Sequence, residues 1–159
     1  MNVTYLNPVI GAATYVLREV CGMEIQTDSP YLTQMAYEET VFIVMIGITG
    51  ELHGQVILSM KESVACDVAS RMMMGMPVPE LNDMARSAIA ELMNMTMGNA
   101  VTAFFNMGIK LDITPPTLFV SNTLSMNVGN AKMICMPITY EGDNLIELHI
   151  AIKEPDKKK

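Results

Sequence analysis

Apolar residues recur at steps of three and four in three stretches of the chain, a spacing that places them on one face of an α-helix. In the first stretch Pro8 lies in the first turn, where proline is well tolerated. A glycine follows the last apolar position of each stretch, as is typical of helix C-termini. The pattern predicts helices over residues 7–20, 61–74 and about 82–106, ending at Gly22, Gly75 and Gly108.

The segments between these helices are rich in β-branched and other apolar residues, which is typical of strands. Gly50 separates two long stretches of this kind, and we expect them to form a hairpin. Pro115 and Pro116 should end one strand and form a loop before the next. The predicted strands are residues 23–27, 31–37, 40–49, 51–60, 109–113, 117–120, 132–140 and 145–152.

The order of these elements predicts the fold class. Strands follow one another through short turns without repeated strand–helix–strand alternation, so the sheet should be largely antiparallel, with three helices covering one face. We therefore expect an α+β fold in a single domain over residues 1–159, with 154–159 as a solvated tail. Residues 21–25 resemble residues 107–111, and each segment follows a helix and precedes an extended segment and two long strands. This similarity predicts two related helix-then-strands halves.

Composition narrows the classes of function. The chain has 159 residues, 50% of them hydrophobic, and 10 basic against 17 acidic residues give a formal net charge of −7. A chain of this length and hydrophobicity can bury a core, which argues against intrinsic disorder. The acidic balance without a basic stripe argues against nucleic-acid binding. No apolar run approaches the roughly 20 residues of a membrane span, which argues against insertion in a membrane.

The cysteines and histidines offer little chemistry. Three widely separated cysteines without a Cys-x-x-Cys pair argue against a disulfide framework or a zinc site, and favour reduced thiols and a cytoplasmic location. Cys66 lies among apolar residues of the second predicted helix, which favours a core position over a nucleophile. His53 and His149 lie in different predicted strands, which favours structural or exposed roles over a pair of metal ligands.

Methionine is unusually frequent in this chain. There are 17 methionines and no tryptophan, and Met72, Met73, Met74 and Met76 form a dense cluster. Thioether side chains fill irregular cores, and they also line adaptable protein-binding surfaces. We expect the core role for this cluster, with the interaction role as the alternative.

The long predicted helix carries one polar stripe. At about 100° per residue, Ser87, Glu91 and Asn94 share a face, with the small residues Ala90 and Gly98 beside them. The opposite face is apolar and consists of Ala85, Ile89, Leu92, Met93, Ala100, Ala103 and Phe104. Because the apolar face should pack on the sheet, the polar stripe should be exposed on a convex helix surface.

Exposure decides what this stripe can do. A general acid needs a carboxyl removed from water, and a metal site needs two more carboxylates and a histidine at helical spacing. The helix provides neither. An exposed carboxylate such as Glu91 can instead pair with a lysine of a partner, and the amide of Asn94 can hold a water in line for attack. The alternative is that the three polar side chains are only solvated, as is common on outward helix faces.

The run from Ser87 to Ala100, Ser-Ala-Ile-Ala-Glu-Leu-Met-Asn-Met-Thr-Met-Gly-Asn-Ala, resembles the signature of the CheX/CheC/FliY family of CheY-phosphate phosphatases. That signature has Asp or Ser, three residues, Glu, two residues, Asn and then a glycine-containing continuation. Three further stretches are similar to CheX-like members, in the same order along the chain: residues 46–50, 73–76 and 112–117. The similarity spans most of the chain, from Asn7 to Ile152.

This resemblance implies a protein aspartyl-phosphate phosphatase that acts on a phosphorylated CheY-type response regulator in bacterial chemotaxis or another two-component pathway. In that family the Asn orients the attacking water and the Glu engages a lysine of the regulator. The resemblance thus assigns these roles to Asn94 and Glu91, with Ser87 at the start of the motif. We expect Ser87, Ala90 and Gly98 at the partner-binding surface, where the small residues Ala90 and Gly98 would let a partner come close. It implies that the regulator holds Mg²⁺ and that this chain has no metal or cofactor of its own.

The resemblance also implies a homodimer that forms through sheet edges, for which the Val- and Ile-rich strands are suited. The first predicted helix has no Glu-x-x-Asn, so the resemblance implies one site, as in CheX-like members, rather than the two of CheC-like members. The alternative to catalysis is a non-catalytic adaptor or scaffold of the same fold that binds a response regulator or a flagellar-switch protein.

Overall fold

The computed structural model describes residues 2–37, 39–121, 124–126 and 130–155, and these form an α+β fold. The helices are η1 (Val3–Tyr5), α1 (Leu6–Glu19), α2 (Glu62–Met72) and α3 (Asp83–Asn106). The strands are β1 (Ile25–Thr27), β2 (Tyr31–Thr33), β3 (Met35–Tyr37), β4 (Val41–Gly50), β5 (His53–Met60), β6 (Leu111–Ile113), β7 (Thr117–Ser121), β8 (Leu124–Met126), β9 (Met133–Tyr140) and β10 (Asn144–Lys153).

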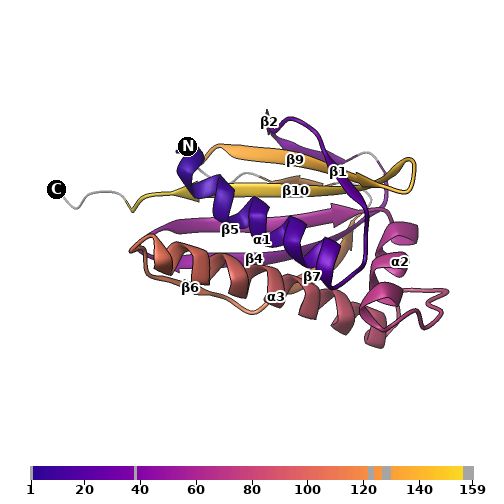
Figure 1. Cartoon of the computed structure of the whole chain (residues 1–159). Coiled ribbons are helices and arrows are strands. Elements are labelled where there is room, and N and C mark those ends of the chain that lie inside the picture. Colours follow the sequence, from indigo (N-terminus) through magenta and orange to yellow (C-terminus); the bar gives the residue numbers. More distant parts are fainter. Residues whose placement is uncertain (1, 38, 122–123, 127–129, 156–159) are drawn as a thin grey trace.

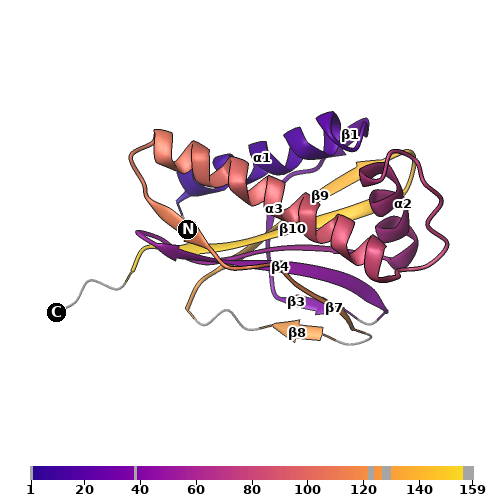
Figure 2. The same ribbon diagram turned by 90° about the horizontal axis from the view of Figure 1, so that it is seen from below.

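Eight of these strands form one antiparallel sheet in the order β1-β9-β10-β5-β4-β6, with β2 also paired to β9 and β7 to β4. The helices α1, α2 and α3 cover one face of this sheet, as the sequence predicts (Figure 1). A separate pair of strands, β3 and β8, lies across the opposite face (Figure 2). None of the helices in the described ranges has the length and apolar composition that a membrane crossing requires.

The sheet confirms the two related halves. The strands β1 and β2 pair with β9 in the way that β6 and β7 pair with β4, and β5 and β10 pair with each other at the centre. The helix that begins each half ends in the same manner, because Gly22 after α1 and Gly108 after α3 have positive φ angles of 62° and 83°. The helices α1 and α3 are therefore counterparts, one in each half.

Two parts of the strand prediction are wrong. Residues 31–37, expected as one strand, are two, because β2 pairs with β9 while β3 leaves the main sheet and pairs with β8. The strand β8 has only three residues and was not predicted. The hairpin of β4 and β5 and the break at Pro115 and Pro116 are confirmed. Of the tail expected over 154–159, residues 156–159 lie outside the described residues.

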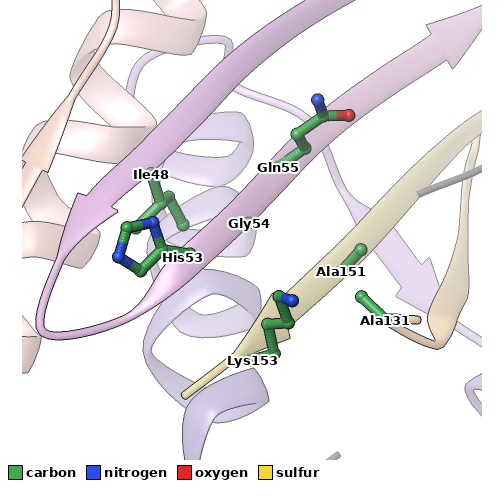
Figure 3. Close-up of a pocket in the computed structure, with 7 residues that line it drawn as sticks. All are labelled: Ile48, His53, Gly54, Gln55, Ala131, Ala151 and Lys153. Carbon is green, nitrogen blue, oxygen red and sulfur yellow. The ribbon is translucent and has the colours of Figure 1, made fainter. Parts of the chain in front are cut away.

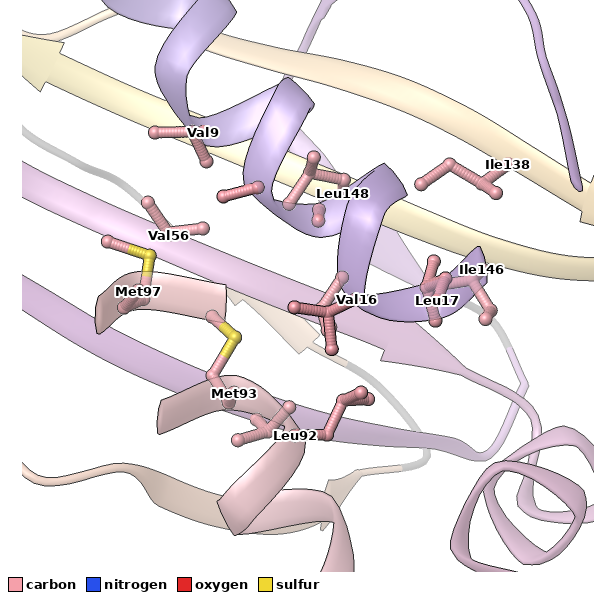
Figure 4. Packing of buried hydrophobic residues seen from close by; sticks show 14 of the residues in the cluster. Val9, Val16, Leu17, Val56, Leu92, Met93, Met97, Ile138, Ile146 and Leu148 are labelled. Atoms are coloured by element: carbon pink, nitrogen blue, oxygen red, sulfur yellow. The ribbon is translucent and has the colours of Figure 1, made fainter. Parts of the chain in front are cut away.

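The main core lies between the helices and the sheet (Figure 4). Its central side chains are 2% exposed or less: Val9, Val16, Leu17, Val56, Leu92, Met93, Met97, Ile138, Ile146 and Leu148. Burying one side chain of this size stabilises the fold by about 1.5–3 kcal/mol. Turning α3 about its axis would expose several of them at once, so the core fixes which face of α3 points outward.

A polar cluster holds β3 against the far face of the sheet. The Tyr37 hydroxyl donates to Glu147 Oε2 at 2.9 Å and lies 2.8 Å from His149 Nε2, and Ser59 Oγ lies 3.1 Å from the same nitrogen. The imidazole of His149, whose Nε2 lies 3.8 Å from Glu147 Oε2, and the hydrogen bond from Tyr37 lower the pKa of Glu147, against the opposing effect of burial. The expectation for the histidines is confirmed, because His149 is buried in this cluster and His53 is exposed.

The cysteines differ in burial. Cys21 and Cys135 are buried, whereas Cys66, expected in the core, is half-buried on α2. Loss of hydration raises the pKa of the Cys66 thiol, and the nearby carboxylates of Glu62 and Glu80 raise it further. A thiol held in its protonated form is a poor nucleophile, so Cys66 does not resemble a catalytic cysteine.

Candidate active site

The N-terminus of the helix α3 is fixed by local interactions. The Asn82 side chain accepts a hydrogen bond at 2.9 Å from the backbone N–H of Ala85 and so caps the N-terminus. Asp83 lies in the first turn, where its negative charge is stabilised by the positive end of the helix dipole. Six of the seven residues predicted for the buried face are buried, whereas Ala103 is only half-buried. Thr96 and Met97, which were not predicted there, are buried too, so the face consists of Ala85, Ile89, Leu92, Met93, Thr96, Met97, Ala100 and Phe104.

The predicted polar stripe lies on the outward face of this helix. Ser87, Glu91, Asn94 and Gly98 are exposed, and Ala90 beside them is half-buried. Spacings of three and four residues place successive members of the stripe next to one another on the helix surface. The fold therefore brings together on one surface all five residues that the sequence analysis assigned to the site.

No neighbour in the described chain engages the polar groups of this stripe. Ser87, Glu91 and Asn94 have neither a side-chain hydrogen bond nor an ion pair with any described residue. A carboxylate, a hydroxyl and an amide are thus presented to the solvent by a rigid helix. Such a surface can supply a charge, a hydrogen-bond donor and an acceptor to a partner that docks on it.

The stripe does not hold the ligands of a metal site by itself. Glu91 is its one carboxylate, and within the described residues no group of three or more His, Cys, Asp or Glu side chains is placed to bind a metal ion. Mg²⁺ requires several oxygen ligands in octahedral geometry. The Glu91 carboxylate alone does not provide them.

The methionine cluster is only partly in the core, which corrects the sequence-based expectation. Met72 and Met73 pack against the main core, but Met74 is 99% exposed and Met76 is 52% exposed. Met74 has a positive φ of 58° where the chain leaves α2, a conformation that glycine adopts more easily. Met84, in the first turn of α3 and three residues before Ser87, is also exposed.

Part of the motif is repeated on α1, and the sequence analysis missed it. Asn7 and Gly11 are exposed and four residues apart, as Asn94 and Gly98 are on α3. Thr4 occupies the position three residues before Asn7, where α3 has Glu91 three residues before Asn94. The repeat that pairs residues 21–25 with 107–111 aligns Asn7 with Met93, one residue away from Asn94, so neither that repeat nor a search for Glu-x-x-Asn reveals the shared spacing.

A hollow on the other side of the sheet does not belong to this site (Figure 3). It has a volume of about 360 Å³ and is lined by Ile48, His53, Gly54, Gln55, Ala131, Ala151 and Lys153. Gln55 and Ile57 are two residues apart on β5, so their side chains point to the same face of the sheet. The cluster that contains Ile57 packs on the face away from the helices. Because the sheet separates this hollow from α3, it offers nothing to a ligand bound at Asn94.

Comparison with known proteins finds relatives along almost the whole chain. The family described as chemotaxis phosphatase CheX matches residues 42–139. The CheY-P phosphatase CheX of Thermotoga maritima is 32% identical over 153 residues, which are 96% of this chain and 98% of that protein.

Solved structures share the fold. A CheX–CheY–BeF₃–Mg²⁺ complex from Borrelia burgdorferi contains a chain that matches with a TM-score of 0.78 and 27% identity, over 94% of this chain and 98% of that one. The chemotaxis protein CheX from Desulfovibrio desulfuricans matches with a TM-score of 0.81 and 21% identity, over 94% of this chain and 99% of that one. The second likeness shows the fold alone.

Proposed function

The chain belongs to the chemotaxis phosphatase CheX family, and from this premise we propose that it hydrolyses the aspartyl phosphate of a CheY-type response regulator. One observation carries the proposal to particular residues: Glu91 and Asn94 stand exposed and unpaired on the outward face of α3, within a sequence that resembles the family signature. The Thermotoga maritima relative is a CheY-P phosphatase, and the Borrelia burgdorferi relative forms a complex with CheY. We propose the cytoplasm as the location of this activity, in keeping with the proposed substrate.

In this proposal Asn94 orients the attacking water. Its amide has an oxygen that accepts and an NH₂ group that donates, so it can hold a water by one hydrogen bond and the phosphoryl region by another. Hydrolysis of a phosphoryl group depends mainly on positioning and on neutralisation of charge. Because no residue in the described chain binds the Asn94 side chain, it is free to enter the regulator's site.

Glu91 has a different proposed role, which is to pair with a lysine of the regulator. It lies three residues before Asn94 and therefore on the same face of α3. A charge pair formed at the docked surface fixes the register of the helix and so aims Asn94 at the phosphoryl group. Ser87, Ala90 and Gly98 form the surrounding contact surface, where the two small residues allow close approach.

Mg²⁺ is proposed to come bound to the regulator, since the stripe has one carboxylate of its own. When bound, the ion neutralises negative charge on the transferring phosphoryl group. The residues of this chain contribute the position of the water and the register of the complex.

Because the proposed reaction depends on Mg²⁺, adding EDTA should stop the catalysed release of phosphate. Restoring Mg²⁺ should recover it.

The function is tested by measuring release of inorganic phosphate from phosphorylated CheY-type receiver domains with Mg²⁺ and a substoichiometric amount of this chain. We expect many turnovers for each molecule. Binding to the phosphorylated receiver without faster release of phosphate would instead identify an adaptor. The absence of both binding and turnover across a panel of receivers would contradict the proposed function.

We also propose that the chain forms a homodimer through edges of the sheet. The edge strands β2 and β7 carry exposed apolar side chains, with Leu32 63% exposed and Val120 45% exposed. Such an edge offers both unpaired backbone groups and apolar surface to a second strand. Light scattering coupled to size exclusion should give about twice the chain mass of 17.5 kDa. A mass of one chain at all concentrations would contradict the dimer.

A further inference from the structure

Two glycines in the middle of helices are not explained by the packing of the chain itself. Gly11 in α1 and Gly98 in α3 are exposed, and a Cβ atom added at either would meet nothing within 4 Å apart from the adjacent residues and backbone of its own helix. Glycine is less favourable than any residue except proline in a helix interior. Neither has the positive φ that explains Gly22 and Gly108. The absent side chains leave space on the outer surface of the two helices.

Gly11 lies in a groove between α1 and α3. The two helices pack against each other (Figure 1). The groove between them has a volume of about 500 Å³. It is lined by Asn7, Pro8, Gly11, Ala12, Tyr15, Asn99, Thr102, Ala103 and Asn106. None of these residues is charged, which disfavours a phosphate, a nucleic acid or a metal ion as the occupant.

The polar side chains of the groove are available to a partner. Tyr15 is 56% exposed, and neither its hydroxyl nor the amides of Asn7, Asn99 and Asn106 have a hydrogen-bond partner among the described residues. An asparagine amide both donates and accepts, which matches the two polar groups of a peptide unit. A tyrosine adds a large contact surface with a polar tip. This combination fits an uncharged loop of a protein.

The groove is continuous with the proposed active site. Gly98 lies four residues after Asn94 and Thr102 four residues after Gly98, so the three share one side of α3. The Thr102 hydroxyl donates to the Gly98 carbonyl at 3.0 Å and lines the groove. A partner that covers Asn94 and passes over Gly98 therefore reaches the groove without crossing another element.

We propose that the groove between α1 and α3 receives an uncharged loop of the same phosphorylated receiver domain that docks on Asn94. This inference rests on the proposed function for the identity of the partner. It assigns α1 to the docking surface and gives Gly11 and Tyr15 roles in binding the receiver. The groove sets affinity and has no part in the hydrolysis itself.

The test compares Gly11→Gln, which fills the groove, with Gly11→Ala, which adds only one methyl group. Both should fold, because the space at Gly11 is open and both new residues favour helix. Gly11→Gln should raise KM for the phosphorylated receiver and weaken its binding to the BeF₃-activated receiver, each about tenfold, with kcat unchanged. The matched control is Ser63→Gln on the exposed surface of α2, which should leave both quantities as in the wild type.

Tyr15→Ala provides a second variant, and it should weaken binding in the same direction while melting as the wild type does. If both Gly11→Gln and Tyr15→Ala keep the KM and the affinity of the wild type, the groove does not bind the receiver. The proposed hydrolysis would be unaffected by that result. The wild type could also bind the BeF₃-activated receiver but release no phosphate, which would contradict the proposed hydrolysis. Weaker binding by both variants would then still support the proposal that the groove binds the receiver. Failure of the wild type to bind any receiver overturns both.

Discussion

Replacing Asn94 with alanine should lower kcat for release of phosphate about 100-fold or more, the effect of losing one positioned hydrogen-bonding group at a reacting centre. The variant loses the amide that holds the water, while Glu91 and the rest of the docking surface stay in place. KM should therefore change much less than kcat. Steady-state phosphate release with a saturating phosphorylated receiver measures the two quantities separately.

The fold should not suffer from this substitution. Asn94 is exposed, has no partner among the described residues, and lies in the middle of α3, where alanine is the better helix former. The melting temperature of Asn94→Ala should be that of the wild type or slightly higher. Asn130→Ala, which removes an exposed amide before β9, is the matched control and should keep full turnover. Full turnover in Asn94→Ala would show that the water is positioned by some other group.

The stripe on α3 could be predicted from sequence because it depends only on local geometry. A helical period fixes which side chains share a face, and the apolar face tells which side must be buried. Both inferences hold along α3 except at Ala103, and Leu92 and Met93 are buried between the exposed Glu91 and Asn94. The outward direction of the stripe follows from the packing of that buried face on the sheet.

The features that the sequence did not reveal depend on long-range pairing. The cluster of Tyr37, Ser59, Glu147 and His149 forms because β5 pairs with β10 in a register that places Ser59 opposite Glu147, and because β3 leaves the main sheet to cross its far face. No local pattern near residue 34 marks that departure. The period along one strand gives its two faces but not its neighbours.

The groove between α1 and α3 belongs to the same class of hidden feature. Gly11 interrupts an otherwise regular helical pattern, and a single sequence does not say whether a neighbouring helix fills the space beside it. The structure supplies the missing fact, since the space at Gly11 and at Gly98 is open. Exposure of Met74 is similar, because the spacing of residues 72–76 could not tell a core position from a loop.

Replacing Glu91 with glutamine should raise KM for the phosphorylated receiver about tenfold, corresponding to the loss of roughly 1.4 kcal/mol from the docked complex. Glutamine keeps the shape and most of the hydrogen bonding of the side chain but removes the charge that pairs with the regulator's lysine. Because the pair forms on docking and Asn94 is intact, kcat at saturation should fall less than about threefold. Steady-state kinetics at two salt concentrations measure both effects.

The salt dependence of KM and a control substitution distinguish a specific charge pair at Glu91 from a general effect of the net charge on KM. Added salt should raise KM for the wild type more than for Glu91→Gln, since the variant has no pair left to screen. Glu24→Gln removes one exposed negative charge away from α3 and should leave KM unchanged. In a double-mutant cycle, substitution of the regulator's lysine should cost little more once Glu91 is already glutamine. Additive costs in that cycle would mean that Glu91 and the lysine do not meet, and Glu91 would then be a solvated residue beside Asn94.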